Sequence, residues 1–273
     1  MTTRKKIDCH THINTEDVRR EYFSRTDGYA LTMQFLDKFV TETLQDDAEA
    51  TVAKDARLFL CPCIDIHKDI PPQLAKIEEK LTEFRVVGLK IFLTYQNGRS
   101  DDEKMMLIYE FARKHRLTVT YHTGSCSLVL PSDDDLEGSR AIYVERVAEQ
   151  FPDVNFVVAH MGDPYYDETM RIVHNHENMF TDFSGAYEPG TPEGADMGWA
   201  IATFAHAIDQ FPDSYKKILY GTDFCPPINL SALDEYDVTI AKIFQPEQFE
   251  DVYYNNALRA FPRLAEFLRE EEI

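Results

Sequence analysis

The segment IDCHTH, residues 7 to 12, places two histidines one residue apart at the end of a short apolar run. Side chains in a strand alternate between its two faces, so His10 and His12 are expected to project to the same side, close enough to bind one ion. The pair in HNH, residues 174 to 176, has the same spacing but follows a helical pattern that starts at residue 163. Residues two apart in a helix point about 200° away from each other. His174 and His176 are therefore not expected to share a metal.

Short apolar runs rich in β-branched and aromatic residues recur along the chain and predict buried strands. Helical patterns lie between most of them, for example at 100–116, 139–151 and 196–211. Such alternation is typical of a parallel sheet. The seven predicted strands are residues 6–9, 58–64, 86–93, 117–121, 155–159, 179–182 and 218–221.

The chain length of 273 residues matches the size of one (β/α)8 barrel, about 250 residues. We therefore predict an α/β fold, a distorted (β/α)8 TIM barrel formed by a single domain over residues 1–273. The distortion is expected in residues 14–57, which show helical patterns such as YALTMQFLDKFVTETLQ, residues 29–45, and no convincing strand. The second strand is therefore expected to be short, or the barrel to be irregular there.

Three further predicted strands end in a residue that commonly binds metals: His122 in VTYHTG, His160 in VVAHMG and Asp223 in LYGTDF. The strands of a parallel barrel end at one mouth, so these residues are expected to meet His10 and His12 there. Neutral imidazoles with one carboxylate suit zinc best, although manganese, iron and cobalt accept the same ligands. Surface or packing roles are expected for the other histidines, which are His67, His115, His174, His176 and His206.

The motifs DCHTH, YHTG, AHMG and YGTDF, in this chain order, resemble those of the amidohydrolase superfamily, in particular its amidohydrolase-related branch of metal-dependent hydrolases and decarboxylases. The resemblance spans nearly the whole chain. It implies that His10, His12, His122 and Asp223 bind one divalent ion. His160 would lie beside the metal as a hydrogen-bonding or acid/base group.

A second metal is an alternative that the same resemblance raises. Other branches hold two ions bridged by a carbamylated lysine of the fourth strand, and VVGLKIF offers Lys90 near that position. A single ion with an unmodified Lys90 is the preferred interpretation.

The predicted ligands leave the charge of the ion only partly neutralised, so the pKa of a bound water would fall from 15.7 toward about 7. The expected activity is hydrolysis of a small amide, ester or lactone, with Asp223 as general acid/base and His160 steadying the oxyanion. The alternative is nonoxidative decarboxylation of a small unsaturated or aromatic carboxylic acid. A third reading is a non-catalytic metal-binding barrel. A carboxylate substrate would need a cation, and Lys90, Arg85 and Arg99 flank the fourth strand, although each arginine is more simply a surface charge.

The composition limits the classes of molecule that the protein is expected to bind. The net charge of −20 argues against binding to nucleic acid or to an anionic membrane surface, and favours a small-molecule substrate. Five cysteines without CxxC spacing predict thiols, and no run resembles a signal peptide or a membrane span, so a cytoplasmic location is expected. Assembly into a homo-oligomer and the identity of the substrate are left open. Specificity is expected to lie in the loops at 13–57, 124–138 and 184–198.

Overall fold

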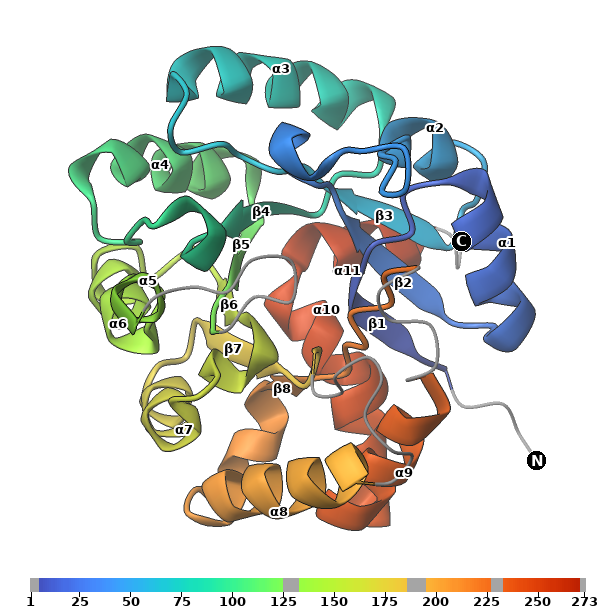
Figure 1. Ribbon diagram of the computed structural model, residues 1–273, viewed down its shortest axis with the longest axis vertical. Coiled ribbons are helices and arrows are strands. Elements are labelled where there is room, and N and C mark those ends of the chain that lie inside the picture. The colour runs from blue at the N-terminus through green and yellow to red at the C-terminus, as the bar shows by residue number, and fades with distance from the viewer. Residues whose placement is uncertain (1–4, 125–132, 186–194, 227–232, 271–273) are drawn as a thin grey trace.

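In the part of the chain that the structure describes, eight parallel strands form the centre of the molecule (Figure 1). The computed structural model describes residues 5–124, 133–185, 195–226 and 233–270. All seven predicted strands are present, with ends shifted by a few residues. The strands are β1 (Ile7–Thr11), β2 (Tyr29–Met33), β3 (Leu58–Cys61), β4 (Gly88–Phe92), β5 (Thr118–His122), β6 (Phe156–Val158), β7 (Met179–Asp182) and β8 (Ile218–Leu219).

The strands form two sheets that backbone hydrogen bonds join into a ring. One sheet has the order β1-β2-β3 and the other β4-β5-β6-β7-β8. Between β3 and β4, the amide of Val87 donates to the carbonyl of Leu60 at 3.0 Å. Between β8 and β1, the amide of Cys9 donates to the carbonyl of Tyr220 at 2.9 Å. These two seams close the TIM barrel that the sequence predicts.

The prediction that residues 29–45 are helical is wrong: the segment starts with a strand, and beyond it only the short 3-10 turn Asp37–Phe39 is helical. Tyr29–Met33 form β2, which pairs in parallel with both β1 and β3. All but the first residue of this strand are buried. A strand that is buried on both faces shows no polar alternation in its sequence, so YALTM resembles one turn of an apolar helix. The barrel therefore has its second strand.

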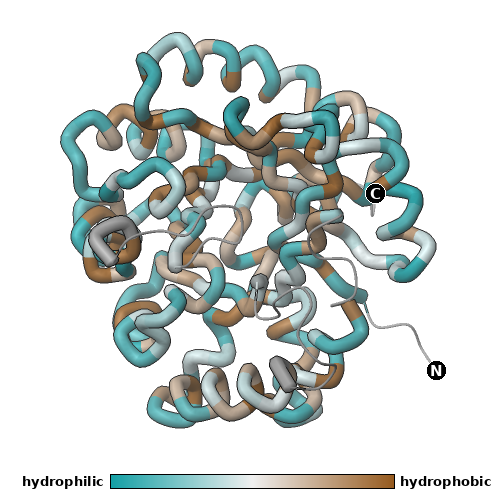
Figure 2. Tube along the Cα trace, in the orientation of Figure 1, coloured by the Kyte–Doolittle hydropathy of each residue, from teal (hydrophilic) through white to brown (hydrophobic). Residues whose placement is uncertain are grey.

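Helices surround the ring of strands, and hydrophilic and hydrophobic stretches alternate along them (Figure 2). The patterns at 100–116, 139–151 and 196–211 form α4, α6 and α8, as predicted. None of the helices in the described ranges is long and apolar enough to cross a membrane. The outer helices are α1 (Glu16–Arg25), α2 (Ala48–Val52), α3 (Ile70–Glu83), α4 (Met106–His115), α5 (Asp133–Gly138), α6 (Ala141–Gln150), α7 (Tyr166–Asn175), α8 (Ala195–Asp209) and α9 (Leu233–Ile243).

Two carboxy-terminal helices, α10 (Asn256–Ala260) and α11 (Pro262–Glu270), cover the end of the barrel where the strands begin. Phe261 and Leu264 are fully buried in one apolar cluster with Ile7 of β1. The hydroxyl of Thr118, the first residue of β5, donates to the carbonyl of Ala260 at 2.6 Å. The opposite end, where the strands finish, is thus the end that can carry a site.

Two of the loops expected to carry specificity fall largely outside the described residues. The missing parts are residues 125–132 and 186–194, and Cys126 lies in the first of them. Within the first loop, Asp133–Gly138 form α5.

Candidate metal centre

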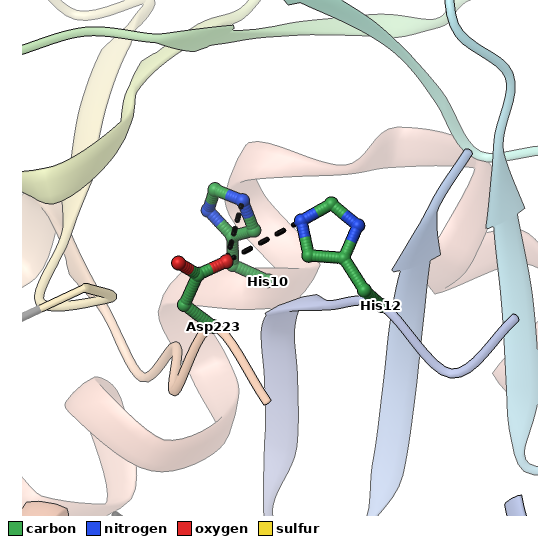
Figure 3. A group of neighbouring side chains, drawn as sticks. All are labelled: His10, His12 and Asp223. Carbon is green, nitrogen blue, oxygen red and sulfur yellow. Dashed lines mark ion pairs between the residues drawn. The ribbon is translucent and has the colours of Figure 1, made fainter. Parts of the chain in front are cut away.

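His10, His12 and Asp223 meet at the carboxy-terminal end of the barrel (Figure 3). His10 lies in β1, His12 directly follows it, and Asp223 follows β8 across the seam. The Oδ1 atom of Asp223 is 3.6 Å from Nε2 of His10 and 3.4 Å from Nε2 of His12. The backbone amide of Asp223 donates to the carbonyl of His10 at 2.8 Å, and its φ of 54° turns the chain sharply. The seam therefore holds the three side chains together.

The hydrogen bonds of the two histidines direct their Nε2 lone pairs toward Asp223. Nδ1 of His12 is 3.0 Å from the carbonyl of Met33, and Nδ1 of His10 is 3.2 Å from Oδ2 of Asp182. Both partners are acceptors, so each Nδ1 carries the proton and each neutral ring has its lone pair on Nε2. The two lone pairs thus lie around one carboxylate oxygen, and that of His10 also accepts from the Lys90 ammonium, whose Nζ is 2.8 Å from Nε2, so that a cation already stabilises this arrangement. The residues present fit a divalent metal.

The electrostatics of the centre keep the ligand groups in their metal-binding forms. Burial, followed by the positive charge of Lys90, lowers the pKa of His10 to about 4. Burial opposes ionisation of Asp223, but the imidazoles of His12, His10 and His160 hold its pKa well below the ordinary value. At neutral pH His10 is therefore neutral and Asp223 is ionised, as metal binding requires.

The other two predicted site residues, His122 and His160, form a neighbouring pair. Nδ1 of His122 is 2.9 Å from Nε2 of His160, and Nδ1 of His160 is 2.8 Å from the carbonyl of Ser184. His160 therefore donates from Nδ1 and accepts from His122, whose own lone pair is then on Nε2. The rings of His10 and His160 lie 5.0 Å apart, centroid to centroid. The structure thus places the pair beside the centre, and the role of His122 as a ligand stays a prediction.

The backbone around His160 is strained in a way that serves this pair. His160 and Met161 have φ values of 58° and 50°, a region that non-glycine residues rarely adopt. Gly185 lies against the ring, since a Cβ atom there would be 2.8 Å from Nδ1 of His160. A larger residue at 185 would push the imidazole away from Ser184.

Asp182, the last residue of β7, is a site residue that our reading of the sequence missed. Its side chain is fully buried; Oδ2 contacts His10, and Oδ1 accepts from the backbone amide of His160 at 3.0 Å. Burial alone would raise the pKa of Asp182, but the neighbouring imidazoles of His10 and His160 and the hydrogen bond from the hydroxyl of Ser184 hold it well below the ordinary value. The strand-end rule that identified His122 and Asp223 applies equally to MFTD, residues 179–182, and would have found it.

Asp8 supports the turn that carries Asp223. It lies in β1, two residues before His10, and is fully buried. Its carboxylate accepts from Thr222, both from the amide at 3.1 Å and from the hydroxyl at 2.6 Å, and from the hydroxyl of Tyr22 at 3.0 Å. Burial nevertheless raises the pKa of Asp8 to about 7. Through Thr222, Asp8 fixes β1 to the residue before Asp223.

Lys90 is the cation of the fourth strand that reaches the centre. It is fully buried, with Nζ 2.8 Å from Nε2 of His10, and burial lowers its pKa to about 8. Arg85 lies at the opposite end of the barrel, where its guanidinium donates to the carbonyl of Val52 at 2.8 Å. Arg99 forms a bidentate pair with Asp101. Neither arginine serves the mouth, in agreement with the simpler interpretation of both.

The HNH pair does not form a metal site. The helix α7 ends at Asn175, so the prediction that it includes His176 is wrong by one residue, and His176 is extended. Nδ1 of His174 is 3.2 Å from the hydroxyl of Ser214, whereas Nε2 of His176 is 3.0 Å from Glu145. The two rings thus have separate partners, as expected.

Comparison with known proteins identifies the family. A family model described as amidohydrolase matches residues 7–263, so this chain belongs to the amidohydrolase family. No curated protein matches it.

Solved structures share the fold over nearly the full length of both chains. An amidohydrolase from Burkholderia multivorans with bound zinc has a TM-score of 0.66 at 13% identity, covering 94% of this chain and 99% of that one. A probable 2-pyrone-4,6-dicarboxylic acid hydrolase from Acinetobacter baumannii, with citric acid bound, has a TM-score of 0.64 at 14% identity, covering 94% of this chain and 99% of that one. The 5-carboxyvanillate decarboxylase from Sphingomonas paucimobilis has a TM-score of 0.56 at 13% identity, with the same coverage of both chains. At sequence identities this low, the similarity shows a shared fold.

Replacing Asp182 with asparagine is expected to weaken zinc binding by about 10- to 100-fold. The amide oxygen can still accept from Nδ1 of His10, but it carries no negative charge and would stabilise the Nδ1 proton less, so the Nε2 lone pair would be less well directed. Competition with a chelator measures the zinc affinity. Asp213→Asn, at a side chain that is 82% exposed, is the control. Equal affinities for the Asp182 variant and wild type would contradict this role.

Replacing Lys90 with methionine is expected to stabilise the metal-free protein at neutral pH by up to about 3 kcal/mol. This is the free-energy cost of burying the protonated lysine that corresponds to its lowered pKa. The unfolded chain keeps the lysine proton up to about pH 10.4, whereas the folded chain releases it near pH 8. Wild-type stability therefore gains a favourable contribution as pH rises between these values, and the variant lacks it.

Urea unfolding at several pH values measures this effect. The buried thiols of Cys9 and Cys61 also affect stability at alkaline pH, but they are common to both proteins. The difference between wild type and variant therefore reports Lys90 together with His10 and Cys61, whose pKa values its charge lowers. A difference that stays constant from pH 7 to 10 would show that Lys90 does not titrate as the structure indicates.

Proposed function

We propose that this chain is a metal-dependent hydrolase that cleaves a small amide, ester or lactone. The observation that carries the proposal is the convergence of two imidazole lone pairs and one ionised carboxylate at the barrel mouth. Membership of the amidohydrolase family and the zinc-bound structure from Burkholderia multivorans support a metal at this place. Zinc is the proposed ion, held by His10, His12 and Asp223, with His122 as the fourth ligand.

A divalent ion bound there would lower the pKa of water and polarise the oxygen of the substrate bond. Asp223 is the group of the chain that can accept the proton of the attacking water, because it is ionised and its side chain is 26% exposed. The same carboxyl can then return the proton to the leaving group. Asp182 is buried and keeps the imidazole of His10 in one orientation.

His160 is proposed to stabilise negative charge that develops on the substrate. In the structure its Nε2 accepts from His122, and its Nδ1 donates to Ser184. A donor for an oxyanion therefore requires a proton on Nε2. Asp182, whose Oδ1 accepts from the backbone amide of His160, is a buried carboxylate close to this ring.

Nonoxidative decarboxylation of a small unsaturated or aromatic carboxylic acid is the second candidate. The buried ammonium of Lys90, beside His10, favours it because it could pair with a carboxylate of the substrate. Asp223 would then deliver a proton to carbon rather than accept one from water. The two reactions use the same residues and differ in the substrate that occupies the centre.

Elemental analysis of the purified protein, followed by a panel of amides, esters, lactones and aromatic acids, tests the proposal. About one zinc per chain is expected, with turnover that a chelator abolishes and zinc restores. Two ions per chain would favour a carbamylated Lys90. Release of carbon dioxide without hydrolysis would favour the second candidate, and bound zinc without any turnover would favour a non-catalytic barrel.

A further inference from the structure

The hydroxyl of Ser184 lies among three groups of the candidate centre and takes part in no step of the proposed reaction. Its Oγ atom is 2.5 Å from Oδ1 of Asp182. The same atom is 2.9 Å from Nδ1 of His10 and 2.9 Å from Nδ1 of His160. Ser184 is 1% exposed, so these contacts are shielded from bulk water. One buried hydroxyl thus touches both histidines and the carboxylate that lies beside them.

The chain directly after β7 fixes the hydroxyl in this place. Oδ1 of Asp182 accepts from the backbone amide of Ser184, at 3.0 Å, as well as from its hydroxyl. An aspartate that binds the amide two residues further on forms a common local turn. Gly185, with a φ of 68°, then carries the backbone past the ring of His160. The segment DFSG, residues 182–185, therefore builds the contact from one short stretch of sequence.

The protons among these groups have one consistent arrangement. Oδ1 of Asp182 also accepts from the amide of His160, so it is an acceptor, and the Ser184 hydroxyl gives it its only proton. The Ser184 oxygen can then only accept, so Nδ1 of both His10 and His160 must donate to it. Each ring has a second acceptor that requires the same proton, Oδ2 of Asp182 for His10 and the Ser184 carbonyl for His160. Both rings therefore carry their lone pair on Nε2.

A second metal site is the alternative use of the same side chains. One ligand atom each of His10, His160 and Asp182 lies within 4.8 Å of the other two. The Ser184 hydroxyl lies within 2.9 Å of an atom of all three, however, so it fills the space between them. A metal there would also have to displace the protons on both Nδ1 atoms. The geometry favours a hydrogen-bonded group over an ion.

We infer that Ser184 is a positioning residue that couples the metal ligand His10 to its neighbour His160. Because one hydroxyl, held by Asp182, accepts from both rings, neither imidazole can turn without disturbing the hydrogen bond of the other. Ser184 thereby helps to keep both Nε2 atoms directed away from the buried carboxylate. The inference rests on the proposed function for the role of His10 as a ligand, whereas the coupling of the two rings is a property of the metal-free protein.

NMR of metal-free protein with isotope-labelled histidine tests the coupling without metal or substrate. The Nδ1 protons of His10 and His160 are expected to give downfield signals that exchange slowly with water. In Ser184→Ala each ring keeps its second acceptor, so both signals should persist, move upfield and exchange about three- to tenfold faster, the effect of losing one hydrogen bond. The Nδ1 proton of His12, which binds the carbonyl of Met33, should not change and is the internal control.

Two further variants separate the hydrogen bonds from packing and from the loss of any buried hydroxyl. Ser184→Cys fills the space, but a thiol is a weak donor and acceptor, so it should behave like Ser184→Ala. Zinc affinity, measured by competition with a chelator, should fall about tenfold in both variants. Ser214→Ala is the matched control, because Ser214 is also 1% exposed and its hydroxyl lies 3.2 Å from Nδ1 of His174. It should leave the zinc affinity unchanged.

Several outcomes would overturn the inference. They are a response of only one of the two rings, an equal response of His12, no slowly exchanging Nδ1 signal from His10 or His160 in the wild type, and wild-type behaviour of Ser184→Cys. A zinc affinity of Ser184→Ala equal to that of wild type would overturn it as well. If the wild type binds no zinc, the proposed function fails, while the NMR comparison still decides whether Ser184 couples the rings. Melting temperatures close to that of wild type establish that the variants are folded.

Discussion

Replacing Asp223 with asparagine is expected to lower kcat by about 10²- to 10⁴-fold on any substrate that the wild type hydrolyses. The amide has the same shape, so the turn after β8 and the hydrogen bond from the Asp223 amide to His10 should persist. It cannot accept a proton from water, however, and it brings no negative charge to the two lone pairs that face it. Steady-state kinetics at saturating substrate and saturating zinc measures the effect.

The control for this variant must remove the same negative charge at a position away from the metal centre. Asp213→Asn does so at an exposed side chain, and it should leave kcat unchanged. The zinc content of the Asp223 variant, measured in parallel, separates lost proton transfer from lost metal. If Asp223→Asn, fully loaded with zinc, kept more than about a tenth of the wild-type kcat, the general acid/base role of Asp223 would be wrong.

Replacing His10 with alanine is expected to have the largest effect on metal content, with zinc lost from the purified protein. His10 contributes a neutral imidazole to the centre, and its removal also leaves the ionised Asp182 without its buried partner. Activity should fall below detection for this reason rather than through slower proton transfer. Elemental analysis after dialysis against a weak chelator gives the zinc-to-chain ratio.

His174→Ala and His176→Ala are the matched controls, because they remove histidines of the same spacing from another part of the chain. Both should retain the zinc content of the wild type, since their rings bind Ser214 and Glu145 instead. His10→Gln, which fills more of the buried space than alanine, guards against loss of folding. Zinc loss in either control variant would show that the ion binds elsewhere than at the barrel mouth.

The sequence predicts most of the fold because buried parallel strands and amphipathic helices leave distinct patterns. The prediction fails at β2, where YALTM joins directly to further apolar residues that have helical spacing. The decisive contacts there are the parallel pairings with β1 and β3, which lie far from β2 in sequence. Local propensity carries no information about such partners.

The candidate site, like the fold, could be predicted from the sequence only in part. His10, His12 and Asp223 could be brought together from the parallel arrangement of strands alone, since position at a strand end determines where each side chain points. The hydrogen bond between His122 and His160 could not, because it depends on side-chain rotamers and on a backbone with positive φ at His160. The contact between Lys90 and His10 likewise depends on how deeply the lysine side chain is buried.

The helices that cover the amino-terminal end of the barrel have a consequence for biosynthesis. Ile7 is synthesised well before its apolar partners Phe261 and Leu264, which lie more than 250 residues further along the chain. Until then the nascent chain must carry an unfinished hydrophobic surface, which makes folding slow and dependent on contacts of high sequence separation. Translation through residue 264 is therefore the step at which the barrel can first become a cooperative unit.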